Sequence, residues 1–450
     1  MGSEFQLVES FADRARDRFA GRAIWHVSST LRGGGVAEML RSFLPYVRDA
    51  GVDTRWIVLR ESAEFFILTK RIHNRLHGFP GDNGGLAGLE RELYDRTLGV
   101  SAGYLVNLIQ EGDIVYLHDP QTAGLVPAIA RAGGTVIWRC HIGSDDPSAW
   151  ADSAQEFLLP YVREADACVF SRRQYAWPGL RDVPNWIIPP GIDAFSPKNQ
   201  EISPPVVEDI IGAIGLGEVV PTADPPFTRP DGTPGRIERT AEVTQVDRLR
   251  QDHRLISQIS RWDRLKDHAG LLRCFDSYLS DEACHLALVG PATRAVADDP
   301  EGSEVYSAMM AAFEKLKPSR RERVHIVNLP MDDLDENGAM VNALQCRSEI
   351  VVQKSLAEGF GLTVAEAMWK SKPVVASGIG GIQDQIKDSE NGMLIEDPED
   401  LESFAESIAR LEGNRDLAGS LGAAGKRTVR EKYLAPWRLG NHLEMLEGIT

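Results

Sequence analysis

The chain has 450 residues, more than one hydrophobic core normally supports, so two domains are the first expectation. Apolar residues make up 43% and charged residues 26% of the chain, ordinary values for a globular protein that exclude a disordered or fibrous one. The formal net charge of −17 argues against nucleic-acid or anionic-membrane partners, because both carry negative charge themselves.

Targeting signals and cysteine usage point to the same compartment. No apolar run approaches the roughly 18 residues of a membrane span, and the start MGSEFQLVES lacks the basic and apolar regions of a signal peptide. The five cysteines are scattered, odd in number and without CxxC spacing, which is typical of buried thiols in a reducing compartment. We therefore expect a cytoplasmic protein without a disulfide framework or a zinc site.

Short β-rich runs alternate with longer helical stretches in the first part of the chain. The runs are AIWHVSS at 23–29, TRWIVL at 54–59, DIVYLHD at 113–119, TVIWRCH at 135–141 and ACVFS at 167–171. Near-continuous apolar strands separated by helices are typical of a parallel, doubly wound sheet. They predict a Rossmann-like domain over residues 1–195.

A stretch rich in proline and glycine follows this domain. Residues 196–250 contain SPP at 203–205 and ADPPFTRPDGTPG at 223–235, with one short apolar segment, VVEDIIGAIGL. This composition is typical of a linker with an elaborated loop. A disordered insertion over 221–240 is the alternative.

The alternation of strands and helices then starts again. The runs are RLISQIS at 254–260, HLALVG at 285–290, VHIVNLP at 324–330, EIVVQKS at 349–355 and KPVVASG at 372–378. They predict a second Rossmann-like domain over residues 251–433. Residues 434–450 have helical apolar spacing behind Pro436, which suits the first turn of a helix. The expected fold class is α/β, with two doubly wound domains facing across a cleft that would hold the site.

The segment EGFGLTVAE, from Glu358 to Glu366, follows a strand of the second domain. A strand end, a glycine-containing turn through Gly359, Phe360 and Gly361, and a helix beginning near Leu362 would present unpaired backbone N–H groups, which attract anions. A diphosphate could rest there. Glu358 and Glu366 could then accept hydrogen bonds from the hydroxyls of a sugar and a ribose. The alternative is a capped surface helix with two solvated glutamates.

The segment SRWDRLKD at 260–267 follows the first strand of the same domain. Arg261 and Lys266 would offer a planar fork and a point charge to phosphate oxygens, whereas Arg264 between them is expected to take no part. Two cations near a leaving diphosphate can replace a metal ion, and we see no DxD-like motif beside them. A solvated surface position is the usual alternative for any single lysine or arginine.

Three glycines, Gly33, Gly34 and Gly35, lie between the first strand and a helix expected to start near Val36. They would let the backbone approach a ligand closely, although the triplet is not a GxGxxG fingerprint. The alternative is a turn that simply needs positive φ. A binding role gains weight because this loop and the 358–366 segment occupy equivalent places in the two domains.

These motifs together resemble glycosyltransferase family four, retaining enzymes with the GT-B fold, over residues 23 to 435 and least at 201–250. The resemblance implies that Glu358 holds the hydroxyls of the donor sugar and Glu366 the ribose. It assigns the diphosphate to Arg261 and Lys266. It also implies that His141 contacts the transferring glucose and that Gly34 and Gly35 approach the donor phosphate and the acceptor. The base would be held by backbone around Asn328 to Met331.

Within this family, four segments resemble the trehalose-forming members and, more distantly, fungal-type trehalose phosphorylases. They are HVSSTLRGGGVAEML at 26–40, YLHDPQTAGL at 116–125, WRCHIGSDDPS at 138–148 and IPPGIDAFSPKN at 188–199. His118 and Asp119 would bind the acceptor or cap a strand. Asp145 would bind the acceptor or cap a helix rather than act as a glycosidase carboxylate. The remaining acceptor candidates are Gln121, Arg139 and Gly35.

The resemblance implies a reversible, metal-independent transfer of glucose from a nucleoside diphosphate glucose to glucose, giving trehalose with retained configuration. It requires no cofactor and leaves the base open. The alternatives are a trehalose phosphorylase using glucose-1-phosphate, a related retaining glycosyltransferase with another acceptor, and a non-catalytic regulator that binds sugar nucleotides. The expected partners are a small sugar and a nucleotide sugar, with a homodimer as the default assembly.

Overall fold

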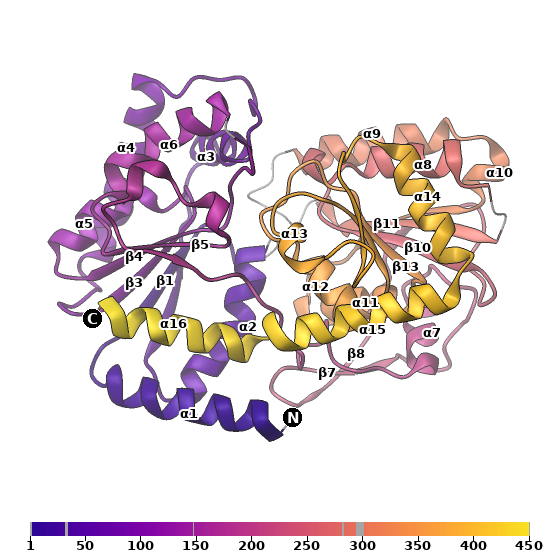
Figure 1. Cartoon of the computed structure of the whole chain (residues 1–450), viewed down its shortest axis with the longest axis horizontal. Helices are drawn as coiled ribbons and strands as arrows, with labels where there is room; N and C mark the ends of the chain where they lie inside the picture. Colours follow the sequence, from indigo (N-terminus) through magenta and orange to yellow (C-terminus); the bar gives the residue numbers. More distant parts are fainter. Residues whose placement is uncertain (1, 32–34, 147, 281–282, 294–300, 450) are drawn as a thin grey trace. The chain divides into compact units, whose positions relative to one another are not determined.

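A computed structural model describes residues 2–31, 35–146, 148–280, 283–293 and 301–449 (Figure 1). The chain forms two compact units, unit 1 comprising Met1–Gly191 with Ala435–Thr450 and unit 2 comprising Ile192–Leu434. Each unit contains a largely parallel sheet with helices on both faces, which confirms the α/β class with two doubly wound domains. Over the described part of the chain, no helix is long and apolar enough to cross a membrane.

The sheet of unit 1 has six parallel strands in the order β2-β1-β3-β4-β5-β6. Its central strands are buried on both faces, as expected from their unbroken apolar runs. The strands are β1 (Ile24–Ser28), β2 (Thr54–Val58), β3 (Ile114–His118), β4 (Thr135–Cys140), β5 (Ala167–Phe170) and β6 (Asn185–Ile187).

The helices of unit 1 enclose two separate apolar clusters, one on each face of the sheet. Helices α3 (Ala63–Leu76), α4 (Gly88–Leu105), α5 (Val126–Arg131) and α6 (Ala149–Val162) cover one face. Helices α1 (Gly2–Arg18), α2 (Gly35–Asp49) and α16 (Ala435–Ile449) cover the other, and α16 packs on both α1 and α2 (Figure 1). In the described part of unit 1, three short 3₁₀ helices connect these elements: η1 (Ala123–Leu125), η2 (Arg173–Tyr175) and η3 (Pro178–Leu180).

Among the described residues, the sheet of unit 2 has seven strands in the order β15-β14-β13-β10-β11-β12-β9, of which only β9 runs antiparallel to its neighbour. The strands are β9 (Glu242–Thr244), β10 (Arg254–Ile259), β11 (Cys284–Pro291), β12 (Val324–Leu329), β13 (Ile350–Gln353), β14 (Val374–Ser377) and β15 (Met393–Ile395). The sequence did not predict β9, β15 or, in unit 1, β6. Each has three residues, too few to show a hydrophobic period.

The helices of unit 2 also divide between the two faces of their sheet. Helices α8 (His268–Tyr278), α9 (Gly302–Glu314) and α14 (Leu401–Glu412) cover one face, whereas α7 (Pro204–Ala213), α11 (Leu334–Arg347) and α12 (Leu362–Trp369) cover the other. The shorter α10 (Pro318–Arg321) and α13 (Ile382–Gln385), the 3₁₀ helix η4 (Arg264–Lys266) and the long α15 (Arg415–Lys432) complete the unit.

Residues 196–250, for which the composition predicts a linker with an elaborated loop, are folded onto unit 2. They contain α7, β9 and a hairpin of β7 (Pro226–Thr228) and β8 (Pro234–Arg236). Phe227 and Ile237 enter the same apolar cluster as α11. The disordered alternative is therefore wrong, because apolar side chains spaced among the prolines supply buried contacts.

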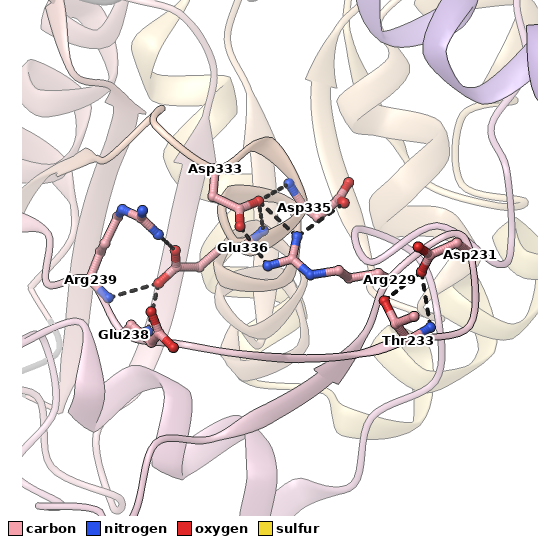
Figure 2. Close-up of polar contacts among 8 residues, drawn as sticks. All are labelled: Arg229, Asp231, Thr233, Glu238, Arg239, Asp333, Asp335 and Glu336. Atoms are coloured by element: carbon pink, nitrogen blue, oxygen red, sulfur yellow. Dashed lines mark hydrogen bonds and ion pairs between the residues drawn. The ribbon is translucent and has the colours of Figure 1, made fainter.

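Carboxylates at the start of α11 hold this segment in place (Figure 2). Arg229 Nη2 lies 2.6 Å from Asp333 Oδ2, and its Nη1 lies 3.3 Å from Asp335 Oδ2. Glu336 is 1% exposed, pairs with the Arg239 guanidinium and accepts hydrogen bonds of 2.7 Å from the backbone N–H groups of Glu238 and Arg239. These charge-assisted contacts fix the segment beside the first turn of α11.

The strand order reverses at one place in each sheet. In unit 1 it reverses between β1 and β3, and in unit 2 between β10 and β13. Loops that leave the carboxyl ends of such neighbouring strands run in opposite directions, which makes this point of an open α/β sheet the usual ligand-binding position. The loops after these four strands are therefore the expected position of a ligand site.

Candidate functional site

Two predicted site residues meet at the reversal point of unit 2. Lys266 lies at the end of η4 after β10, and Glu358 lies in the loop after β13. Lys266 Nζ is 2.6 Å from Glu358 Oε2, and the two side chains are 15% and 12% exposed. Leu265 accepts a 2.7 Å hydrogen bond from the backbone N–H of Leu356, which joins the two loops. The sequence thus correctly placed these two motifs side by side.

The two arginines of the same loop differ in their surroundings. Arg261 is partly buried, and its Nη2 lies 3.7 Å from Oδ2 of the buried Asp263. Arg264 is exposed, and its Nη2 lies 2.8 Å from Glu304 Oε2. With side chains 66% and 72% exposed, this second pair is a surface contact. This position agrees with the expectation that Arg264, unlike Arg261 and Lys266, takes no part in binding phosphate.

The loop from Glu358 to Leu362 is held in a conformation that depends on glycine. Gly361 adopts φ +85° as the residue before α12, which begins at Leu362 as the sequence predicted. Phe360 is buried against Tyr433, with ring centroids 5.4 Å apart. Gln385, which sequence analysis missed, donates a 2.5 Å hydrogen bond to the Phe360 carbonyl. The first turn of α12 therefore follows a rigid turn, an arrangement suited to binding an anion.

A second glycine loop packs against this turn. A Cβ on Gly381 would come within 2.6 Å of the Phe360 Cα, so only glycine fits there. The backbone N–H of Gly381 also donates a 3.2 Å hydrogen bond to the Gly359 carbonyl. The Gly380–Gly381 loop is therefore in direct contact with the 358–362 loop.

Glu366 lies on α12 with a side chain that is 1% exposed. Its Oε1 is 3.0 Å from Lys198 Nζ, and its Oε2 accepts a 3.4 Å hydrogen bond from Gln345 Nε2. Lys198 was missed because only the tertiary structure brings its loop to α12. The carboxylate that the resemblance assigns to a ribose is thus oriented by a lysine and an amide.

Asn328 occupies the carboxyl half of β12 and is 3% exposed. Its Oδ1 accepts a 2.7 Å hydrogen bond from Trp262 Nε1, and its Nδ2 donates a 3.3 Å bond to Glu242 on β9. The Asn328 side chain therefore ties the edge strand and the Arg261 loop to β12. A base contact from the backbone around Asn328 to Met331 stays a prediction.

One acidic motif escaped sequence analysis. Asp333-Leu334-Asp335 has DxD spacing, and this spacing often marks a divalent metal site. In the structure the guanidinium of Arg229 lies between the two carboxylates, in the position that a cation would take (Figure 2). Across the described ranges, no cluster of three or more histidine, cysteine or carboxylate side chains is arranged to hold a metal ion.

In unit 1, three histidines form a row at the reversal point. His26 Nδ1 lies 3.1 Å from His118 Nε2, and His118 Nδ1 lies 3.1 Å from His141 Nε2. Burial lowers the pKa of all three, and Arg139 lowers each of them further. Neutral rings carry one N–H each, so the protons along the row must all point the same way. His141, the predicted sugar contact, is therefore coupled to His118 and, through it, to His26.

Asp119 follows β3 and adopts a left-handed conformation with φ +62°. Its Oδ1 accepts a 2.7 Å hydrogen bond from the backbone N–H of His141. Burial raises the pKa of Asp119 to about 7, against the opposing effects of that hydrogen bond and of Arg139. Asp119 thus caps the end of β4, and a strand cap was one of the two roles expected for this residue. Gln121 is half-buried in the loop that follows.

Arg139 was predicted to bind the acceptor, but its surroundings favour a structural role. It is 2% exposed, and its Nη1 lies 2.5 Å from His442 Nε2 on α16. Its Nη2 donates a 3.1 Å hydrogen bond to the Ile188 carbonyl. The side chain points to the face of the sheet covered by α16 because β4 alternates its residues between the two faces. Arg139 therefore anchors the C-terminal helix.

The other predicted acceptor residues belong to the loop after β4 and to the start of α2. Asp145 pairs with Arg172, a buried residue after β5 that sequence analysis did not single out. Ser148 rather than Asp145 caps α6, since its hydroxyl accepts a 3.2 Å hydrogen bond from the Trp150 N–H. Gly35 is the first residue of α2, one position before the predicted start. Gly33 and Gly34 lie outside the described residues.

Comparison with known proteins gives one consistent result. A family model described as trehalose synthase, N-terminal domain, matches residues 26–177, and one described as glycosyl transferases group 1 matches residues 240–428. A trehalose synthase of Rubrobacter xylanophilus is 32% identical over 437 residues, covering 95% of this chain and 91% of the relative. A trehalose synthase of Pyrococcus horikoshii is 31% identical over 439 residues, with 96% and 91% coverage.

More distant matches include a trehalose phosphorylase and solved structures. The phosphorylase of Pleurotus sajor-caju is 28% identical over 426 residues, but the match spans only 53% of its length. An α,α-trehalose 6-phosphate synthase of Burkholderia multivorans superposes with a TM-score of 0.68 at 15% identity, covering 95% of this chain and 97% of that one. A structure from E. coli bound with UDP-2-fluoro glucose superposes with a TM-score of 0.69 at 12% identity, covering 95% and 98%. At these identities the structures support the fold alone.

Proposed function

Since this chain belongs to the trehalose synthase family of GT-B glycosyltransferases, we propose that it transfers glucose from a nucleoside diphosphate glucose to free glucose. Membership of the family makes it a trehalose-forming hexosyltransferase. The nucleotide-linked donor, the retained configuration and the roles of individual residues are the proposed part.

The observation that carries the proposal is the pairing of Lys266 with Glu358 at the reversal point of unit 2, at 2.6 Å. A cation and a carboxylate placed so closely suit the junction between a diphosphate and a sugar. The lysine would meet the phosphate oxygens and the glutamate the sugar hydroxyls. Arg261, in the same loop, would add a second positive charge. The first turn of α12 would supply backbone N–H groups to the same diphosphate.

The reaction requires charge stabilisation and no protein nucleophile. The bond between the glucose C1 and the diphosphate oxygen breaks, and negative charge develops on the leaving phosphate beside Lys266 and Arg261. The anomeric hydroxyl oxygen of the acceptor glucose forms the new bond to C1 on the same face. Its proton passes to the leaving phosphate oxygen. The products are trehalose and the nucleoside diphosphate, with the configuration at C1 retained.

In unit 1, we assign the sugar contacts to the ends of β3 and β4. His141 follows β4, and its Nδ1 is the ring nitrogen that the histidine row does not use. If the ring protons of the row point toward His141, this Nδ1 carries a proton and donates a hydrogen bond. If they point toward His26, it accepts one. Gln121 and Asp145 lie in the adjoining loops and would contact the acceptor, and Asp119 would do so through Oδ2, because its Oδ1 caps β4. Arg139 is omitted from this assignment because it is buried against α16.

No metal or other cofactor is part of the proposed reaction, because Lys266 and Arg261 supply the positive charge. The DxD-like pair Asp333 and Asp335 supports this choice, since the Arg229 guanidinium already contacts both carboxylates. A cytoplasmic location and a homodimeric assembly remain proposals that rest on the sequence.

Product analysis tests the proposed function. The protein is mixed with ¹³C-labelled glucose and, in separate reactions, with the glucose conjugates of UDP, ADP and GDP or with glucose-1-phosphate. We expect labelled trehalose and free nucleoside diphosphate from at least one nucleotide donor, with the α linkage visible by NMR. If labelled trehalose and phosphate form only in the reaction with glucose-1-phosphate, the protein is instead a phosphorylase. Tight nucleotide-sugar binding without any product would identify a regulator.

A further inference from the structure

A second ion pair lies next in sequence to the Lys266–Glu358 pair and is more deeply buried. Lys354 follows β13, is 1% exposed, and pairs through Nζ with the carboxylate of Asp267. Its Nζ also lies 5.8 Å from the ring centroid of the buried Phe404. Lysine is seldom fully buried, because removing its charge from water is unfavourable. The chain thus retains a buried charge beside a proposed catalytic loop.

The partner of this lysine has an unusual backbone. Asp267 adopts φ +43° and ψ +51°, the left-handed conformation that residues other than glycine rarely take. Its Oδ1 accepts a 2.9 Å hydrogen bond from the Gly270 N–H at the start of α8, while Oδ2 contacts Lys354. A Cβ on Gly270 would come within 2.6 Å of Lys354 Nζ, so the space around the pair is filled. The carboxylate is held from both sides.

A second set of contacts connects Lys354 to Lys266. The Gln258 side chain on β10 accepts a 3.0 Å hydrogen bond from the Lys354 backbone N–H. Its Nε2 donates a 2.6 Å bond to the Lys266 carbonyl. Lys354 is therefore connected to Lys266 in two ways: its side chain pairs with Asp267, the residue after Lys266, and its backbone N–H binds Gln258. Lys266 carries a flexible side chain, so its aim depends on how firmly its backbone is held.

We infer that Lys354 is a positioning residue for glucosyl transfer: its buried pair with Asp267 fixes the left-handed turn that presents Lys266 to the diphosphate. This inference rests on the proposed function. Outliers in backbone conformation persist only where the surroundings over-determine them, and they gather at functional sites. A misplacement of about 1 Å at a reacting group can lower the rate by about 10²-fold. A contact that fixes this turn would therefore support catalysis.

Three variants of the full-length chain separate positioning from simple stabilisation. Lys354→Met keeps most of the length of the side chain but removes its charge. Asp267→Asn keeps an acceptor for Gly270 and a residue that tolerates the left-handed conformation. The double variant removes both charges, so no buried charge is left unpaired. Glu208→Gln is the control, because Glu208 lies 3.0 Å from Arg347, whose guanidinium binds the 250–253 loop before β10.

Each variant is compared with the wild type in thermal melts, in calorimetric binding of UDP, ADP and GDP, and in steady-state assays with the active donor. We expect both single variants to melt at lower temperature and the double variant to regain much of that loss. The double variant should nevertheless show kcat reduced by about 10- to 100-fold, with KM for glucose little changed. Glu208→Gln should lose stability without losing turnover.

These measurements distinguish a positioning role of the Lys354–Asp267 pair from a purely structural one. A double variant with restored melting temperature and wild-type kcat would show that the pair only stabilises the fold, and the inference would be wrong. If the wild type makes no trehalose, the proposed function fails. The positioning of Lys266 is then decided by nucleotide binding, which should be at least about 10-fold weaker in the double variant. Unchanged nucleotide affinity would overturn the inference in that case.

Discussion

Replacing Lys266 with alanine should reduce turnover far more than it reduces folding stability. Preorganised cations act on the charge that grows on the leaving diphosphate, so their loss is felt most in the transition state. Removing one such group typically costs about 10²- to 10³-fold in rate, or about 2.7–4 kcal/mol. Lys266→Ala should show a loss of kcat in this range, with a smaller loss of nucleotide affinity.

The structure also sets the expected cost to stability. The Lys266 and Glu358 side chains are 15% and 12% exposed and lie 2.6 Å apart. Breaking a fully buried pair costs about 3–5 kcal/mol and an exposed one about 0–1, so an intermediate loss of about 1–3 kcal/mol in unfolding free energy is expected. Denaturant melts of the variant measure this quantity separately from its kinetics.

Arg264→Ala is the matched control within the same loop. Arg264 forms a surface pair with Glu304, and its side chain is 66% exposed. Its removal should change both kcat and unfolding free energy little, by about 0–1 kcal/mol for the latter. Arg261→Lys should restore only part of the wild-type rate, because a point charge cannot reproduce a bidentate fork. An inactive Arg264→Ala beside an active Lys266→Ala would refute the placement of the diphosphate and the assignment of the motifs in unit 2.

Three further outcomes are expected. Glu358→Gln should leave nucleotide binding nearly intact in calorimetry while lowering turnover strongly, since the lost charge acts on the sugar at the reacting centre; an unchanged rate would remove Glu358 from the site. A chelator should leave activity unaffected, whereas loss restored by magnesium or manganese would show that a metal is required. Acid should weaken the fold, because burial lowers the pKa of His26 and of His325 to about 3, while the unfolded chain takes up these protons near pH 6.5. This stability is complete above about pH 6.5 and declines as the pH falls toward 3, by about 2 kcal/mol per histidine at pH 5. Asp119, with its pKa raised to about 7, acts in the opposite sense by about 2–3 kcal/mol between pH 7.5 and 5, so the buried histidines together should outweigh it. Equal unfolding free energies at pH 7.5 and 5 would contradict this prediction.

The sequence by itself determined the two sheets and their main motifs. Ten of the strands are near-continuous apolar runs between helices, and such a pattern has few solutions other than a doubly wound sheet. Strand-to-helix loops then fall at the carboxyl edge by geometry alone. For that reason the sequence alone predicts that the loops carrying Lys266 and Glu358 lie together.

Only the tertiary structure reveals the ion pairs between residues that are distant in sequence. Lys198 meets Glu366, Arg229 meets Asp333, and Lys354 meets Asp267 because the chain folds back after 168, 104 and 87 residues, respectively. No local pattern encodes such pairs, since their attraction depends on burial and distance in the folded state. The same holds for Arg139, whose residue type suggested a ligand contact. Its place on the α16 face of β4, set by strand alternation and by a helix some 300 residues later in the chain, makes it a structural anchor.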